Sequence, residues 1–110
     1  MHQQIINEYK SRGWKTQRFA KTIKTLVNED IDVNFVPDAY YVDTVSQIMT
    51  IIEVVHSHDI TDDKMNQIAK LWFDLDYYNW ELALSIVSKH GSLQIDLMGK
   101  YYDMLRKGEK

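Results

Sequence analysis

The chain contains no cysteine and only one proline among its 110 residues. Without cysteine, the protein has no disulfide framework, no thiolate ligand for a metal and no cysteine nucleophile. No apolar run approaches the roughly 18 residues that a membrane-spanning helix needs. The first ten residues, MHQQIINEYK, are polar and then amphipathic, which argues against a secretory signal. These absences predict a cytoplasmic protein without membrane attachment.

Several common catalytic motifs are also missing. The sequence has no phosphate-binding P-loop, no G-x-G-x-x-G fingerprint and no G-x-S-x-G nucleophile motif. Its composition is that of an ordinary globular protein, with 45% hydrophobic and 26% charged residues. A chain of this length can form one modest hydrophobic core. We therefore expect residues 1–110 to form a single domain.

The charge is unevenly distributed along the chain. The net charge of -3 gives no overall field that would attract nucleic acid, but residues 10–24 contain six basic residues and no acidic one. These are Lys10, Arg12, Lys15, Arg18, Lys21 and Lys24. Such a strip is common on a solvated surface, and it can also neutralise phosphates on an otherwise acidic protein. If the protein binds DNA, we expect these six residues to contact its backbone.

Hydrophobic periodicity predicts a mixed α/β (α+β) domain with the order α-β-β-β-α-β-α. We expect a helix at 2–12, strands at 14–20, 32–43 and 48–58, a helix at 59–76, a strand at 79–91, and a helix or a strand at 93–110. Gly13 is expected to stop the first helix and Thr61 or Asp59 to cap the second. The segment 14–20 alternates like a strand, but Phe19 and Ile23 also have helical spacing. About four strands should form a central mixed sheet flanked by helices.

Two carboxylates attract attention within the predicted sheet. Asp38 follows the single proline in VPDAYYVD, and Glu53 lies inside the apolar run MTIIEVV. A carboxylate in an apolar strand is costly unless it is paired, solvated or bound to a metal. If strands 32–43 and 48–58 form a hairpin, Asp38 and Glu53 can meet, and Mg²⁺ is the cation that suits two such groups. The alternatives are a turn or capping role for Asp38 and an edge-exposed or ion-paired Glu53.

This arrangement resembles the PD-(D/E)xK phosphodiesterase superfamily, which includes restriction enzymes, Holliday-junction resolvases and small phage nucleases. The resemblance rests on Pro37-Asp38, the hairpin, Glu53-Val54-Val55 and the helix that follows. It implies a restriction-endonuclease-like fold in which Asp38 and Glu53 bind Mg²⁺ or Mn²⁺. It also implies a phage or mobile-element origin, and therefore a location in the host cytoplasm.

The sequence departs from the family pattern at one position. Val55 occupies the place of the motif lysine, which helps to position or activate the attacking water. Some family members recruit a lysine from the following helix, and Lys64 is placed for this role. By the same resemblance, Gln67 on that helix and Glu8 on the first helix are further candidate catalytic residues.

The first functional hypothesis is a metal-dependent DNA endonuclease that hydrolyses phosphodiester bonds with metal-activated water. Because one small subunit offers little surface to duplex DNA, we expect a homodimer or a larger homo-oligomer. The second hypothesis is a catalytically inactive protein of the same fold that binds nucleic acid or inhibits a host protein. The third is an assembly protein that uses its aromatic surfaces. A zinc site at His56 and His58, with His90, is a further alternative.

Overall fold

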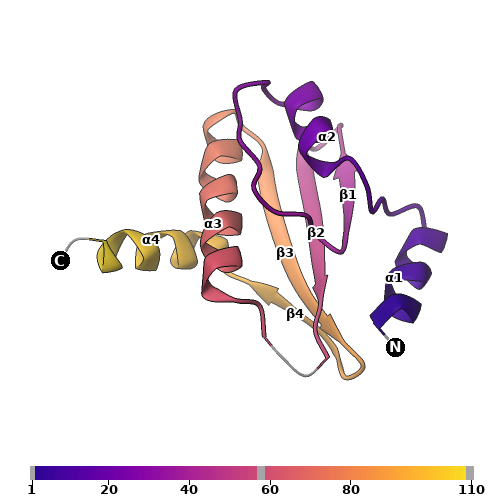
Figure 1. The fold of residues 1–110 in the computed structure, drawn as a ribbon. Helices are drawn as coiled ribbons and strands as arrows, with labels where there is room; N and C mark the ends of the chain where they lie inside the picture. Colours follow the sequence, from indigo (N-terminus) through magenta and orange to yellow (C-terminus); the bar gives the residue numbers. More distant parts are fainter. Residues whose placement is uncertain (1, 57–58, 109–110) are drawn as a thin grey trace.

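A four-stranded mixed sheet forms the centre of the computed structural model, which describes residues 2–56 and 59–108 (Figure 1). The strands, in spatial order, are β1 (Ala39–Asp43), β2 (Ile48–Val54), β3 (Glu81–Ser88) and β4 (Gly91–Ile95). β1 and β2 form one antiparallel hairpin, and β3 and β4 form another. β2 and β3 are parallel, so a crossover must connect them, and helix α3 (Asp62–Tyr77) provides it.

The helices begin and end where the sequence supplies suitable residues. The helices besides α3 are α1 (His2–Ser11), α2 (Phe19–Leu26) and α4 (Leu97–Lys107). Gly13 follows α1 in a left-handed conformation, with φ of 95°. The Thr61 side chain caps α3 by accepting a hydrogen bond from the Lys64 backbone, and Asp96 caps α4 in the same way. No helix in the described part of the chain is long and apolar enough to span a bilayer.

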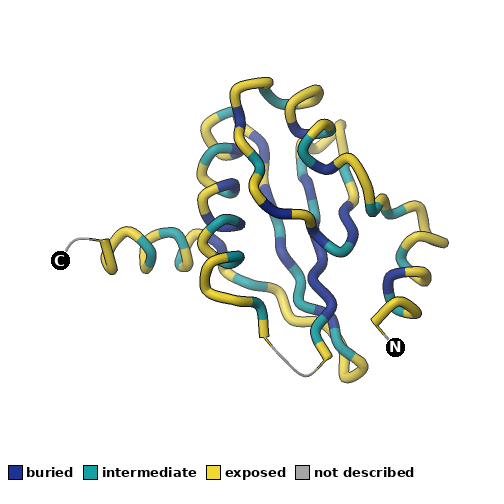
Figure 2. The backbone as a smooth tube through the Cα atoms, in the orientation of Figure 1, coloured by how far each residue is buried: buried dark blue, intermediate teal, exposed yellow. Residues whose placement is uncertain are grey.

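The two faces of the sheet carry separate hydrophobic clusters. The larger cluster joins α2, α3 and the segment between α2 and β1 to one face. Its buried members are Phe19, Ile23, Ile31, Phe35, Tyr40, Met49, Ile51, Ile68, Leu71, Leu75, Trp80, Leu82, Leu84 and Leu97. The smaller cluster packs Ile6 of α1 on the other face, against Ala39, Ile52, Val54 and Val87. Figure 2 shows that burial is concentrated in the sheet and on the inner sides of the helices.

The expected fold class is confirmed: one α+β domain contains a mixed sheet of four strands with helices beside it. The observed order, α-α-β-β-α-β-β-α, agrees broadly with the expected one. The strand expected at 14–20 is wrong, because this segment contributes only one bridge, between Lys15 and Tyr40, before α2 begins at Phe19. Helical spacing prevails there because it buries Phe19 and Ile23 together in the larger cluster.

Two other boundaries differ from those expected. The strand expected over 32–43 begins only at Ala39, and the residues before it cross the larger cluster without regular pairing. The strand expected over 79–91 ends at Ser88, and Gly91, with φ of 125°, starts β4. The segment 93–110 therefore contains both the end of a strand and a helix, with Asp96 between them as the cap. The strand expected at 48–58 ends at Val54, and positions 57 and 58 lie outside the described residues.

Candidate active site

Asp38 and Glu53 meet where β1 begins and β2 ends. Ala39 pairs with Ile52, so Asp38 stands opposite Glu53 one position beyond the ladder. The Asp38 backbone N–H donates to Glu53 Oε2 at 2.9 Å, and the Val54 backbone N–H donates to Asp38 Oδ2 at 2.6 Å. Each carboxylate therefore accepts a hydrogen bond from the backbone of the other segment. This reciprocal pairing holds both carboxylates at the same edge of the sheet.

Glu53 is a buried acid on the inner face of a central strand. It is only 4% exposed, and it points to the same face as Ile51, toward α3. Burial raises the pKa of the Glu53 carboxyl, and the nearby Asp38 carboxylate acts in the same direction. Hydrogen bonds from Lys64 and from the Asp38 backbone lower this pKa, but they do not offset the burial. A further cation beside Glu53 would therefore stabilise the ionised form of its carboxyl group.

Lys64 reaches Glu53 from the first turn of α3. Because the Thr61 cap fixes the start of the helix, Lys64 faces the end of β2. Its ammonium forms an ion pair with Glu53 Oε1 and donates to the carbonyl of Val36 at 3.2 Å. Val55, two residues after Glu53, is half-buried and lines the same hollow as Lys64. Lys64 thus brings an ammonium group into the hollow, to which Val55 contributes an apolar side chain.

An open hollow of about 280 Å³ surrounds these groups. Its lining residues are His2, Asp38, Glu53, Val54, Val55, Asp59, Ile60, Thr61 and Lys64. His2 Nε2 lies 3.4 Å from Asp38 Oδ2, and the His2 side chain is about half exposed. The sequence pattern did not single out His2 because only the packing of α1 against the second face of the sheet brings it here.

The donor set suits a hard cation better than a soft one. Two carboxylates can hold Mg²⁺ or Mn²⁺ when water and substrate oxygens supply the remaining ligands. In residues 2–56 and 59–108, no group of three or more His, Cys, Asp or Glu side chains is arranged to hold a metal ion. A cation at this site would therefore depend on Asp38, Glu53 and non-protein ligands.

Glu8 and Gln67 lie away from the hollow. The Glu8 carboxylate is exposed and forms an ion pair with Arg12, one turn later on α1. Gln67 Nε2 donates to Asp63 Oδ2 at 3.4 Å, along the surface of α3. The structure therefore brings Lys64 to the carboxylate pair but not these two residues.

The basic strip is only partly gathered in space. Lys15, Arg18 and Lys21 line one hollow of about 310 Å³ beside α2. Arg18 and Lys21 also line a neighbouring hollow of about 300 Å³ that extends to Val36, whose carbonyl accepts from Lys64. Arg18 and Lys21 therefore share a hollow with Val36, the residue whose carbonyl contacts Lys64.

The other three basic residues are placed differently. Lys10 is exposed at the end of α1. The Arg12 guanidinium pairs with Glu8 and lies 5.2 Å from the centre of the Tyr9 ring. Lys24 Nζ donates to the carbonyl of Glu29 at 3.0 Å.

The histidines give no support for a zinc site within the described residues. His56 is exposed just after β2, and His90 is exposed in the turn between β3 and β4. His58 lies outside the described residues.

Comparison with known proteins gives no relative. No protein-family model matches the chain, and neither the curated proteins nor the solved structures contain a match. Any functional assignment therefore depends on the geometry of the site itself.

Proposed function

We propose that this chain is a metal-dependent DNA endonuclease of the PD-(D/E)xK type. The observation that carries the proposal is the buried Glu53, which lies opposite Asp38 and in contact with Lys64 at the edge of an open hollow. Burying a carboxylate beside a second one is unfavourable unless cations compensate the charge. A functional site is a good reason to retain such an arrangement in a small core.

Asp38 and Glu53 would hold Mg²⁺ or Mn²⁺. When bound, the ion would lower the pKa of a coordinated water and stabilise negative charge on the phosphodiester. Lys64 would lie next to the water and the phosphate. It would take the role of the family's motif lysine, whose position Val55 occupies in this chain. Its second contact, to the Val36 carbonyl, favours one orientation of the ammonium.

The basic side chains beside α2 support DNA as the substrate. Lys15, Arg18 and Lys21 would contact consecutive phosphates, and the hollow that reaches Val36 would lead the strand toward Lys64. We assign a smaller part in binding to Arg12 and Lys24, since they already have partners within the chain.

The proposal is tested by incubating the protein with supercoiled, linear, branched and single-stranded DNA in Mg²⁺ or Mn²⁺. Asp38→Asn and Glu53→Gln should abolish cleavage, and Lys64→Ala should reduce it at least about a hundredfold. Lys70→Ala, on the exposed side of α3, and Asp76→Asn, near its end, are the matched controls and should cleave like the parent. Cleavage that survives Glu53→Gln would refute the assignment of the site.

The second candidate is a protein of this fold that binds without cleaving. It is favoured by Val55 at the lysine position and by the way Lys64 already neutralises Glu53 without any metal. Calorimetric titration with Mn²⁺ separates the candidates, because only the nuclease needs a divalent ion at Asp38 and Glu53. If no Mn²⁺ binds, salt-dependent DNA binding would then distinguish a nucleic-acid partner from a host protein.

A further inference from the structure

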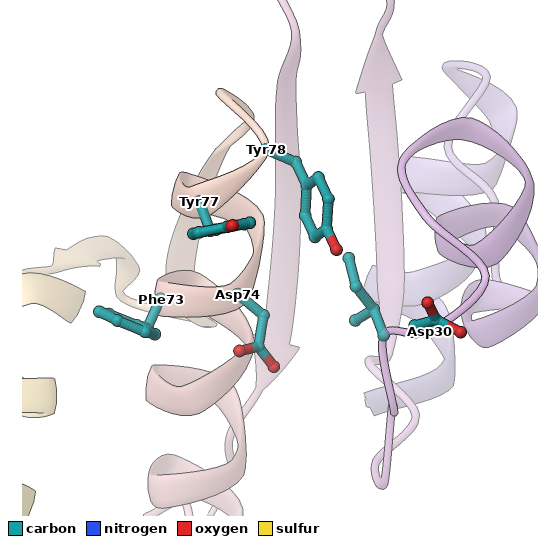
Figure 3. A pocket seen from close by; sticks show the side chains of 6 residues that line it. Asp30, Phe73, Asp74, Tyr77 and Tyr78 are labelled. Carbon is teal, nitrogen blue, oxygen red and sulfur yellow. The ribbon is translucent and has the colours of Figure 1, made fainter.

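A hollow of about 250 Å³ lies beside the last turn of α3, at the opposite end of that helix from Lys64. Its walls come from two parts of the chain that are far apart in sequence. The lining residues are Asp30, Ile31, Phe73, Asp74, Tyr77 and Tyr78. In Figure 3, Asp74 and Tyr78 lie on the side of α3 that faces the segment carrying Asp30. The hollow therefore combines carboxylates from both walls with aromatic rings from α3.

The negative charge of this hollow is not balanced by the chain's own cations. In the part of the chain that the structure describes, neither Asp30 nor Asp74 takes part in an ion pair. Burial raises the pKa of the Asp74 carboxyl, Lys70 offsets this only in part, and Asp32 adds to it. A cation bound between the two carboxylates would supply the missing compensation.

The end of α3 adds to the negative potential of the hollow. The last carbonyl groups of a helix carry partial negative charge, which a basic residue in the last turn can compensate. α1, α2 and α4 each have such a residue. The last turn of α3 has none, and it contains Asp74 and Asp76 instead. The carboxylates and the helix end therefore favour a positively charged ligand at the same place.

The lining favours an organic cation over a metal ion. A hard metal ion requires about six oxygen ligands, whereas three of the six lining residues here are aromatic. Ring faces attract organic cations, and the Tyr77 ring is 76% exposed and open to such a contact. A guanidinium suits this lining better than an ammonium does, because it is planar, weakly hydrated and able to donate to carboxylates on two sides.

The size and charge of the hollow indicate where the guanidinium comes from. Its volume is below the roughly 300–1,000 Å³ that is typical of small-molecule sites, so it suits one side chain better than a whole cofactor. None of the lining residues is cationic, and the hollow therefore offers no partner to the carboxylate of free arginine. An arginine inside a polypeptide carries no such carboxylate.

We propose that this hollow binds an arginine side chain presented by another polypeptide. The guanidinium lies between the carboxylates of Asp30 and Asp74, with the Tyr77 ring against its face. Asp74 is ten positions after Lys64 on α3, about 15 Å along the helix. The hollow is therefore separate from the Glu53 site, and the proposal does not depend on the nuclease assignment.

The proposal is tested by titrating the ¹⁵N-labelled full chain, without DNA or divalent ions, and following its amide chemical shifts. The probe is N-acetyl-arginine amide, and the neutral N-acetyl-citrulline amide is its matched control. The arginine probe should shift the amides of Ile31, Tyr77 and Tyr78 with a Kd of about 1–20 mM, as expected for one exposed ion pair and one cation–π contact. The absence of saturable shifts up to about 100 mM, or equal shifts with the citrulline probe, would overturn the proposal.

Substitutions separate the hollow from the general charge of the helix end. Asp74→Asn and Asp30→Asn should each raise the Kd at least about threefold, and Tyr77→Leu should raise it about twofold. Asp76→Asn is the matched control, since Asp76 is exposed in the same turn of α3 but does not line the hollow, and it should bind like the parent. If Asp74→Asn does not fold, the exposed Asp30 and Tyr77 still provide the test. Equal losses in Asp30→Asn and Asp76→Asn would overturn the assignment of the hollow.

Two further probes test the chemical class of the ligand and its source. N-acetyl-lysine amide should bind at least about threefold more weakly than the arginine probe, because its ammonium is compact and strongly hydrated. Free arginine should also bind more weakly, because its carboxylate meets the acidic walls. Equal binding of the lysine probe would overturn the choice of a guanidinium, and tighter binding of free arginine would overturn a polypeptide as its source.

Discussion

Replacing Lys64 with alanine should destabilise the protein in a pH-dependent way. Glu53 is 4% exposed, and among the described residues the Asp38 backbone would be its one remaining hydrogen-bond donor. Removing one partner of a buried ion pair costs about 3–5 kcal/mol. The Lys64 side chain is 30% exposed, so water screens part of this interaction. We therefore expect a loss of about 1–3 kcal/mol in the free energy of unfolding at pH 8.

The sign of the pH dependence follows from the pKa of Glu53. Lys64 lowers this pKa in the folded protein, so its removal must raise the folded pKa further above the ordinary value of 4.5. A carboxyl with a raised folded pKa binds its proton more tightly in the folded state, so stability falls as pH rises from 4.5 through the folded pKa. The difference between parent and variant should therefore be largest above the raised pKa and nearly absent below pH 4.5.

The assay is urea denaturation at a series of pH values, followed by tryptophan fluorescence. Trp80 is 6% exposed and should report the unfolding of the larger cluster. Lys89→Ala, in the exposed turn between β3 and β4, should show little loss at any pH. Adding Mg²⁺ should restore more stability to Lys64→Ala than to the parent, because the ion replaces the missing cation and binds only the folded state. A loss of stability that does not change with pH would refute the reasoning.

Three further predictions concern other parts of the molecule. Glu53→Gln should flatten the fall in stability that accompanies rising pH above 4.5, because it removes a carboxyl whose pKa is raised in the folded protein. Asp74→Asn should flatten a smaller fall that begins at about pH 3.8, because the Asp74 carboxyl also has a raised pKa but is less buried. Denaturation at several pH values measures both effects. Tyr40→Phe should cost about 1–2 kcal/mol in chemical denaturation, because the hydroxyl of this buried residue donates to a backbone carbonyl before α2. Arg18→Gly should stabilise the fold by about 0.5–1 kcal/mol, because φ is 63° there, while reducing the salt dependence of DNA binding by about one charge. Asn79→Gly, also at φ of 63°, is its control and should leave DNA binding unchanged.

The elements that the sequence predicted well are those with a strong local signal. The run around Glu53 is apolar at consecutive positions, as expected for a strand covered on both faces, and β2 is paired on both sides. α3 begins after Thr61, as its capping residue predicts. β4 gave no such signal, because none of its residues is buried and only hydrogen bonds to β3 define it.

The candidate site was predictable to the extent that a hairpin register is predictable. Once β1 and β2 pair, Asp38 must stand opposite Glu53, and the capped start of α3 places Lys64 nearby. The contribution of His2 was not predictable, because His2 is separated from Asp38 by 36 positions and reaches it through the packing of α1. The strand expected at 14–20 failed because a short segment satisfies both periods until its neighbours are known.

The sequence by itself therefore determined the class of the domain, its central strand, its capped crossover helix and the pairing of two carboxylates. Those features depend on local propensity and on periodicity, which are written in consecutive residues. Only the tertiary structure decided that Phe19 and Ile23 belong to a helix, that Lys64 compensates the buried Glu53, and which apolar residues of α4 are exposed. These outcomes depend on which distant surfaces meet, because burial and charge compensation are set by neighbours in space.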